Sequence, residues 1–284
     1  MFYPDRRFTL SFELFPPKGA DGEAALWQNL GELMRFGPDV VTCTYGAGGS
    51  TRDKTLDIVS QVRQRYGVRV ASHLTCVGST VEQLRAYLAE AQARGIENIV
   101  ALRGDPPRGQ TAFQPVAGGL RYASELVTLI RGEFPHFGIA VAGYPETHQE
   151  AASPQADLEN LRRKVAAGAD CVLTQLFFDN ADFFRFRSRC RELGMKVPVV
   201  PGILPVTNLA QIQRIASLCK ARLPEELVAQ LSRQEDPEWQ FQVGVRWATR
   251  QVQELIDAGV PGLHFYVLNR SPATAAVLSD VKRP

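Results

Sequence analysis

The sequence has few cysteines and no long apolar run, and these absences exclude whole classes of protein. None of its 284 residues lies in an uninterrupted apolar segment near the ~18 residues that a membrane-spanning helix needs. The first ten residues, MFYPDRRFTL, lack the apolar core of a secretory signal. The five cysteines are odd in number and never form a CxxC pair, so neither a disulfide framework nor a thiolate zinc site is indicated. We expect buried, reduced thiols in a cytoplasmic protein.

The sequence also lacks an excess of charge of one sign and any motif of a metal or serine-hydrolase centre. Its 32 Lys and Arg residues nearly balance 30 Asp and Glu residues, with no basic tail. No nucleic-acid or membrane surface is therefore predicted, whereas the binding of small anionic ligands is compatible with this composition. The four histidines show neither HExxH nor another ligand spacing, and GxSxG is absent. We expect no metal ion and no nucleophile elbow.

Short β-branched or apolar runs alternate with longer amphipathic stretches along the whole chain. This alternation is typical of repeated βα units around a parallel sheet. Eight such units favour an α/β fold, a closed (β/α)8 TIM barrel, over a doubly wound open sheet, which usually has fewer strands. The predicted strands are 8–14, 39–44, 68–73, 97–102, 138–143, 170–176, 197–202 and 262–267.

Capping residues and composition predict the helices and the domain count. Helices are expected over 80–95 and 153–168, since each range begins with Ser or Thr and ends with Gly. Helical stretches at 224–232 and 237–258 would be additions before the last strand. No linker rich in Pro, Gly or Ser divides residues 1–284, so we expect a single barrel domain.

Glu13 stands in an otherwise apolar, β-prone run, FTLSFELFPP. Alternation along the strand puts the apolar residues on one face and Thr9, Ser11 and Glu13 on the other. With the apolar face under the helices, Glu13 points into the barrel at the carboxyl end of its strand, where barrel enzymes build active sites. Burial raises the pKa of a carboxyl group, so Glu13 is predicted to keep a proton near neutral pH and act as a general acid. A structural Glu paired with Arg or Lys is the alternative.

Two further strand ends carry residues with more than one interpretation. Gly46, Gly48 and Gly49, in TCTYGAGGSTRD, either let a ligand approach the backbone closely or form a plain turn. The spacing matches neither GxGxxG nor a P-loop. His73 ends the third strand and is either a structural or a functional histidine.

The fourth and sixth strands end in more specific patterns. Arg103 and Asp105, in LRGDPP, precede two prolines that fix the loop, and they either meet a ligand or form a salt bridge with each other. Gln175, in CVLTQLFFDN, places an amide in an apolar run. Its two donors and one acceptor suit the edge of a heterocycle.

These residues belong to nine ordered motifs through which the chain resembles methylenetetrahydrofolate reductase, a FAD-dependent barrel enzyme, over nearly its whole length. The motifs are SFELFPPK, VTCTYGAGGSTRDKT, SHLTC, NIVALRGDPP, VAGYPETH, ADLENLRRKVAAGAD, TQLFFDN, PVVPGILPVTN and HFYVLNR. Since the chain stops at Pro284, the resemblance implies the catalytic barrel without the C-terminal regulatory domain that animal relatives carry.

The resemblance implies an oxidoreductase with a two-step hydride relay. A reduced nicotinamide, NADH or NADPH, gives hydride to FAD and departs, and methylenetetrahydrofolate then takes the hydride to become 5-methyltetrahydrofolate. By the same resemblance Glu13 helps to protonate N10 of the folate, and Asp105 contacts the pterin and tunes the flavin. Gln175 is implied to bind folate and nicotinamide in turn.

Matching the motifs residue by residue implies the remaining site. Folate contacts would also come from Gln211 and Arg270, whereas Ile215 stands where the family has an aromatic residue that stacks on nicotinamide or folate. The electron donor therefore stays open. The implied FAD contacts are Thr44, His73, Leu102, Arg103, Gly104, Asp105, Tyr122, Ala123, Tyr144, His148, Asp157, Asn160, Arg163 and Lys164.

Two other functions fit part of the pattern. Another flavin barrel, such as a proline dehydrogenase, shares the architecture but lacks the pairing of FELFPP with RGDPP. A flavin- or folate-binding barrel subunit without its own NAD(P)H oxidation would tolerate Ile215. In each case the added helices favour a homo-oligomer.

Overall fold

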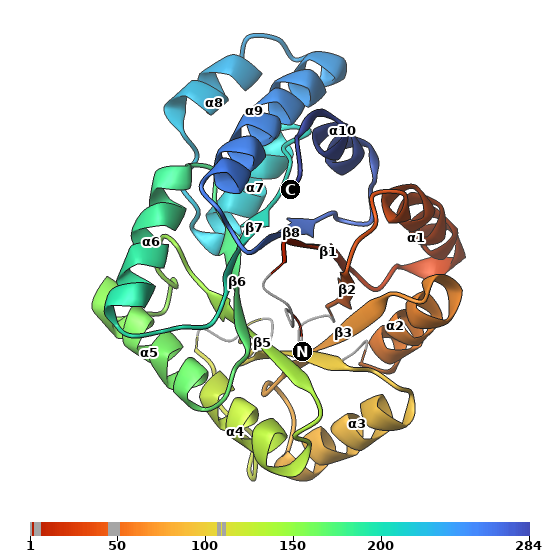
Figure 1. Cartoon of the computed structure of the whole chain (residues 1–284), viewed down its shortest axis with the longest axis vertical. Helices are drawn as coiled ribbons and strands as arrows, with labels where there is room; N and C mark the ends of the chain where they lie inside the picture. The colour runs from red at the N-terminus through yellow and green to blue at the C-terminus, as the bar shows by residue number, and fades with distance from the viewer. Residues whose placement is uncertain (1, 3–6, 45–51, 107–108, 110–111) are drawn as a thin grey trace.

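The structure is a computed structural model that describes residues 2, 7–44, 52–106, 109 and 112–284. Its parallel strands pair in chain order, and β1 also pairs with β8, so that the sheet closes into a barrel (Figure 1). The predicted (β/α)8 barrel is confirmed, and each predicted range overlaps one strand. The strands are β1 Thr9–Leu14, β2 Val40–Cys43, β3 Arg69–Thr75, β4 Asn98–Leu102, β5 Gly138–Gly143, β6 Cys171–Leu176, β7 Val199–Ile203 and β8 Gly262–Tyr266.

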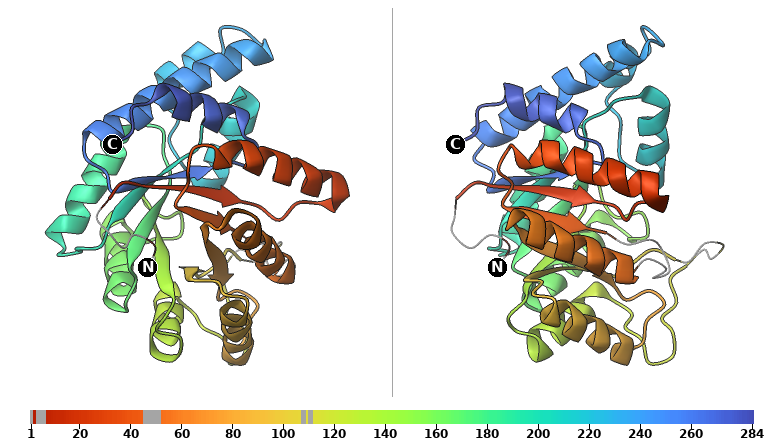
Figure 2. Two further views of the ribbon diagram at one scale, coloured as in Figure 1. Left: turned by 45° about the vertical axis from the view of Figure 1, so that its right-hand side comes forward. Right: turned by 90° about the vertical axis from the view of Figure 1, so that its right-hand side faces the viewer.

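Helices surround the barrel. Helices α8 and α9 lie outside this ring, at one end of the longest axis of the molecule (Figures 1 and 2). Both stand between β7 and β8, as predicted. The helices are α1 Gly19–Met34, α2 Arg52–Tyr66, α3 Val81–Ala93, α4 Ala123–Glu133, α5 Pro154–Ala166, α6 Asn180–Glu192, α7 Leu209–Cys219, α8 Glu225–Leu231, α9 Pro237–Asp257 and α10 Pro272–Asp280.

The helix starts at α3 and α5 follow their capping residues. The Thr80 hydroxyl accepts from the N–H of Gln83 (3.3 Å), whose side chain accepts in turn from the N–H of Thr80 (2.9 Å). Ser153 accepts from the N–H of Ala156 (3.1 Å), ahead of a proline in the first turn. Caps of this kind satisfy amide groups that have no partner within the helix.

The two faces of β1 lie in different environments, as its alternation predicts. Leu10, Phe12 and Leu14 belong to the large apolar core that the strands form with the helices. The side chains of Ser11 and Glu13 instead meet histidines from β3 and β8 inside the barrel. The barrel therefore holds a polar layer within an apolar shell.

Phe2 closes the barrel below this polar layer. It is fully buried and packs with Val40, Ala71, Ala140 and other inward-facing residues. This apolar floor keeps water away from the lower side of the polar layer.

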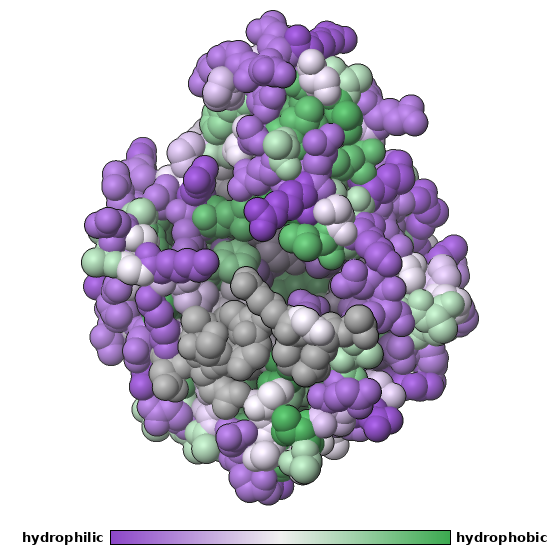
Figure 3. All heavy atoms as spheres, turned by 180° about the vertical axis from the view of Figure 1, so that it is seen from behind, coloured by the Kyte–Doolittle hydropathy of each residue, from purple (hydrophilic) through white to green (hydrophobic). Residues whose placement is uncertain are grey.

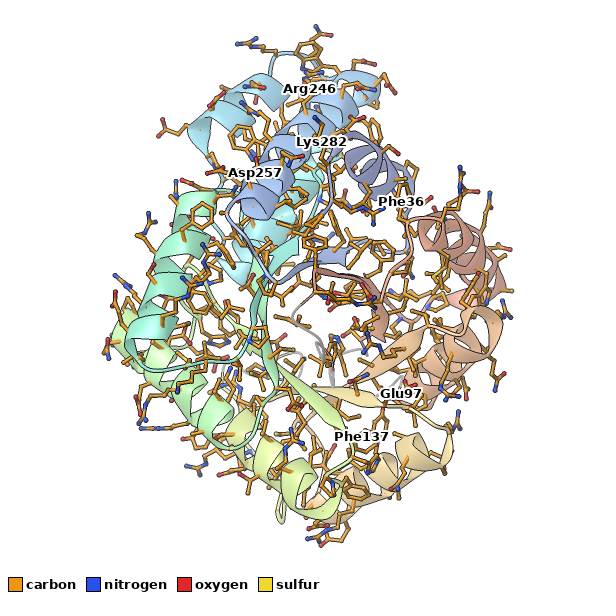
Figure 4. All side chains as sticks on the ribbon, viewed as in Figure 1. Phe36, Glu97, Phe137, Arg246, Asp257 and Lys282 are labelled. Carbon is orange, nitrogen blue, oxygen red and sulfur yellow. The ribbon has the colours of Figure 1, made fainter. Side chains whose placement is uncertain are left out.

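Three carboxylates connect neighbouring strands at the amino end of the barrel. One of them, Glu97, is labelled in Figure 4. Each directly precedes an even-numbered strand, accepts from the second N–H of the preceding strand and pairs with an arginine. They are Asp39 with the N–H of Leu10 and Arg7, Glu97 with the N–H of Val70 and Arg63, and Asp170 with the N–H of Ile139 and Arg131.

Replacing Asp170 by Ala tests this arrangement. The change leaves the N–H of Ile139 (2.7 Å) without its acceptor and removes the carboxylate from the Arg131 guanidinium (2.9 Å), which keeps its bonds to backbone carbonyls. We expect the free energy of unfolding in urea to fall by about 1–3 kcal/mol. Glu32→Ala, which removes the exposed pair with Arg35, is the control and should change it by less than about 0.5 kcal/mol. Equal effects would show that Asp170 is an ordinary surface charge.

Candidate active site

Glu13 lies inside the barrel between two imidazoles. Its Oε2 atom is 3.2 Å from Nε2 of His73, on β3, and 3.3 Å from Nε2 of His264, on β8. The three residues are 7%, 5% and 0% exposed, respectively. The inward position predicted for Glu13 is confirmed, and its partners are histidines in place of the Arg or Lys of the structural alternative.

The predicted rise in the pKa of Glu13 is wrong. Burial does raise this pKa, but the charges of His73 and His264 and the hydrogen bond from His264 outweigh burial and lower it to about 2. Glu13 is therefore ionised at neutral pH, and a proton that it donates must first come from a neighbouring group. The prediction failed because two strands far away in sequence bring the histidines to the carboxylate.

His264 extends the polar layer to Ser11. Its Nδ1 atom lies 2.9 Å from the Ser11 hydroxyl, which also lies 3.2 Å from the carbonyl oxygen of Leu263. Since an ionised Glu13 only accepts, Nε2 of His264 donates to it. A neutral His264 then accepts from Ser11 at Nδ1, whereas a cationic one donates there. The three side chains thus form a path along which a proton can move.

The sequence prediction missed His264 as a site residue. The signal was present, because His264 and Tyr266 alternate in HFYVLNR and so share the inner face of β8. The alternation of side chains did not show that β8 pairs with β1. This pairing places His264 beside Ser11 and Tyr266 beside Glu13.

Tyr266 lies beside Glu13 in register, and Gln175 follows Thr174, whose carbonyl oxygen Tyr266 contacts. The Tyr266 hydroxyl donates to the carbonyl oxygen of Thr174 (2.6 Å). A Cβ on Gly202 would meet that oxygen at 2.2 Å and the Tyr266 ring at 2.7 Å, so only glycine fits there. Gln175 is half-buried, and its side-chain oxygen accepts from the N–H of Leu176 (2.9 Å). Its amide nitrogen remains a donor for a ligand.

A second group of predicted residues gathers where β5 meets α5. The rings of Tyr144 and His148 meet edge to face at 4.6 Å, and Asp157 accepts from the N–H of His148 (3.0 Å). Lys164 donates to the carbonyl oxygen of Ala142 (2.5 Å), and burial lowers its pKa to about 8. Burial and the nearby Asp105 raise the pKa of Tyr144 above its usual value. This group offers cationic, anionic and aromatic contacts on one side of the barrel mouth.

Arg103 and Gly104 continue this side after β4. Arg103 makes two short bonds to Glu150 (2.7 and 2.8 Å), so its ion-pair partner is Glu150 and not the nearby Asp105. Gly104 has a φ of +87°, and a Cβ there would meet Val77 at 2.7 Å. The loop therefore requires glycine for two separate reasons.

The other predicted residues differ in exposure. Thr44, Leu102 and Ala123 are half-buried, whereas Asp105, Tyr122, Asn160 and Arg163 are exposed, with Tyr122 at 54%. Gly46, Gly48 and Gly49 lie outside the described residues.

Gln211, Ile215 and Arg270 line a common cavity of about 290 Å³ whose wall also includes Tyr266. Through Tyr266 the cavity adjoins the surroundings of Glu13. Seen from the side opposite to Figure 1, the molecule is hollowed near its middle, with apolar residues gathered beside the hollow and toward α7–α9 (Figure 3). Gln211 and Arg270, two predicted residues far apart in sequence, thus lie on the wall of one cavity.

No group of three His, Cys, Asp or Glu residues suited to a metal ion is found in the described part of the chain. Nor does any described helix have the length and apolar character needed to cross a membrane.

The family model described as methylenetetrahydrofolate reductase matches residues 3–282. The chain belongs to this family. It is 42% identical to a 5,10-methylenetetrahydrofolate reductase of Pectobacterium carotovorum subsp. carotovorum over 95% of this chain and 89% of the relative. It is 41% identical to that of Escherichia coli over 95% and 90%, respectively. The resemblance stated from the motifs is confirmed, and with it the assignment to an oxidoreductase family.

Plant members of the family are longer. The chain is 40% identical to methylenetetrahydrofolate reductase (NADH) 1 of Arabidopsis thaliana over 95% of its own length but 48% of the relative, so it spans about half of such relatives. Among solved structures, an uncharacterised protein from Clostridium thermocellum that binds two copies of 5-methyl-5,6,7,8-tetrahydrofolic acid superposes with a TM-score of 0.65 at 16% identity, covering 96% of this chain and 93% of that one. At that identity the similarity concerns the fold.

The lowered pKa of Glu13 predicts a pH dependence of stability. A carboxylate whose pKa is lower in the folded state stabilises the fold above its ordinary value of 4.5, and this contribution is lost as pH falls toward 2. Between about pH 5 and pH 3 wild type should lose on the order of 2 kcal/mol more of its unfolding free energy than Glu13→Gln. Urea unfolding at several pH values measures this. Glu32→Gln, at an exposed site, should follow wild type, and parallel curves for Glu13→Gln would contradict the assignment.

Proposed function

We propose that this protein reduces 5,10-methylenetetrahydrofolate to 5-methyltetrahydrofolate, with hydride supplied by NAD(P)H through bound FAD. The observation that carries the proposal is the buried Glu13–His264 pair next to a cavity lined by Gln211 and Arg270. A proton source and a binding surface for a large heterocyclic substrate thus adjoin at the carboxyl end of the barrel.

The residues where β5 meets α5 fit FAD. Lys164 is a half-buried cation and Arg163 an exposed one, and we infer that both meet the diphosphate. Asp157 would accept from ribose hydroxyls, and the half-buried Tyr144 and His148 offer ring faces and edges. The remaining FAD contacts inferred from the motifs extend this surface along Arg103, Gly104 and the start of α4. When bound, FAD would carry hydride between the nicotinamide and the folate.

We infer that Glu13 delivers a proton to N10 of the folate as the five-membered ring opens. Because the pKa of Glu13 is about 2, the carboxylate needs a proton from an adjacent imidazole. His264 is placed to supply it, with its Nε2 atom 3.3 Å from Oε2 of Glu13. The apolar floor around Phe2 excludes water from below, so proton exchange takes place at the mouth.

The cavity gives the substrate its orientation. Arg270 provides a cation at the rim for an anionic substrate group, Gln211 a neutral hydrogen-bonding group, and Ile215 an apolar surface without a ring face. Asp105, exposed after β4, would place a negative charge near the flavin and disfavour its anionic reduced form. We further propose a cytoplasmic location, consistent with five free thiols in the described chain.

Purified protein tests the proposal directly. With FAD added it should show the visible absorption of a bound flavin, be reduced by NADH or NADPH, and be reoxidised by methylenetetrahydrofolate in stopped flow. Protein that stays colourless with FAD would contradict any flavin function. Protein that binds FAD and folate but accepts no hydride from either nicotinamide would favour the barrel-subunit alternative.

Replacing Glu13 by Gln separates the two half-reactions. Reoxidation by methylenetetrahydrofolate should slow by about 10²–10⁴-fold, because the proton donor is lost. Reduction of the flavin by the nicotinamide should change by less than about threefold, since that step needs no proton from Glu13. His264→Asn should slow reoxidation by an intermediate factor. Equal loss of both half-reactions in Glu13→Gln would assign Glu13 a structural role.

A further inference from the structure

Arg222, in the loop between α7 and α8, joins two other loops at the carboxyl end of the barrel. Its backbone N–H donates to Oε1 of Glu146 (2.8 Å), in the loop after β5. Its guanidinium donates to Asp179 (2.9 Å) and Asp182 (2.8 Å), at the start of α6. Neither motif matching nor the site described above uses this residue.

The loop after β5 needs such an anchor. Thr147 adopts a φ of +88°, in the left-handed region that non-glycine residues rarely occupy. Its two neighbours are both held by carboxylate bonds, since Glu146 accepts from Arg222 and the N–H of His148 donates to Asp157. Strained backbone persists only where its surroundings fix it. Arg222 therefore holds one side of the turn that presents Tyr144 and His148.

The two carboxylates that Arg222 contacts at α6 are also held in place. Asp179 caps this helix through the N–H of Ala181 (2.9 Å), and Asp182 is 7% exposed. The loop that leads into α6 begins directly after β6, which carries Gln175. Arg222 is thus connected to the loops that follow two neighbouring strands.

Arg222 is also fixed relative to α7. The helix ends at Lys220 in the left-handed conformation, and the N–H of Ala221 donates back to Ala216 (3.0 Å). Gln211 and Ile215 lie on this same helix and line the cavity. In the right-hand view of Figure 2, α7 stands toward the end of the barrel opposite to the C-terminus. A shift of Arg222 would therefore move the cavity wall.

We propose that Arg222 is a positioning residue that fixes the cavity wall on α7 against the loop after β5. The assignment of these two surfaces to folate and FAD, respectively, rests on the proposed function. Arg222 itself touches neither ligand surface and acts through Glu146, Asp179 and Asp182.

The positive charge of Arg222 explains why a neutral side chain at this position would not hold the loops together. Without the guanidinium, the carboxylates of Glu146, Asp179 and Asp182 would face one another, with Arg185 still paired to Asp182. Burial and the charges of Asp182 and Asp179 already raise the pKa of Glu146. Like charges at this range repel, so the loops should separate.

Arg222→Ala tests the proposal, with Arg185→Ala as the matched control. Arg185 pairs with the same Asp182 but only within α6. We expect the KM for methylenetetrahydrofolate to rise about tenfold in Arg222→Ala while kcat stays within about threefold, the pattern of a lost binding geometry. The control should keep KM within about twofold. A KM that is unchanged in Arg222→Ala, or that rises equally in both variants, overturns the proposal.

Two further variants separate positioning from simple loss of stability. Arg222→Lys keeps a cation beside the carboxylates, which Arg222→Ala lacks, and should recover KM to within about threefold of wild type. Glu146→Gln in the Arg222→Ala background removes one repelling charge and should lower KM relative to Arg222→Ala alone. Failure of both variants to recover KM counts against the charge argument.

Hydrogen exchange tests the same inference without activity. Amides in 144–148 and 209–219 should exchange faster in Arg222→Ala than in Arg185→Ala, because the guanidinium bonds to Asp179 and Asp182 are lost and the unpaired carboxylates repel Glu146, although residue 222 keeps its backbone N–H. If wild type lacks reductase activity, the proposed function fails while this measurement still decides the role of Arg222. Unchanged exchange in both segments would overturn the proposal.

Discussion

The contact between the Glu13 carboxylate and two imidazoles is the interaction on which the rest of the site depends. A buried carboxylate is costly unless charges or donors compensate it, and His73 and His264 supply both from separate strands. These partners keep Glu13 ionised, so its chemistry is that of one member of a proton path and not of an isolated acid. Closure of the barrel between β1 and β8 is what brings His264 within reach.

The two ends of the barrel carry different residues: structural ion pairs lie at the amino end, and the candidate active site lies at the carboxyl end. At the amino end, Asp39, Glu97 and Asp170 repeat one arrangement that fixes neighbouring strands, and Phe2 closes the interior. At the carboxyl end, Gln211, Arg270 and Tyr266 line one cavity. Substitutions at the two ends should therefore have different consequences, as the barrel architecture leads one to expect.

Several parts of the fold could be read from local patterns. The eight strands follow from alternating apolar runs, and the start of α3 from Thr80, because capping and side-chain parity act between residues close in sequence. Motif matching identified Gln211 and Arg270, which the structure places around one cavity. It did not identify Arg222, whose partners Glu146 and Asp179 lie on other elements.

The sequence by itself determined the barrel, the inward direction of Glu13 and the family. Only the tertiary structure decided that the pKa of Glu13 is lowered, that Arg103 pairs with Glu150, and that His264 belongs to the site. The physical reason is the same in each case. Parity and capping are set within a few residues of chain, whereas electrostatic partners are set by distance in space, which closure of the sheet brings about.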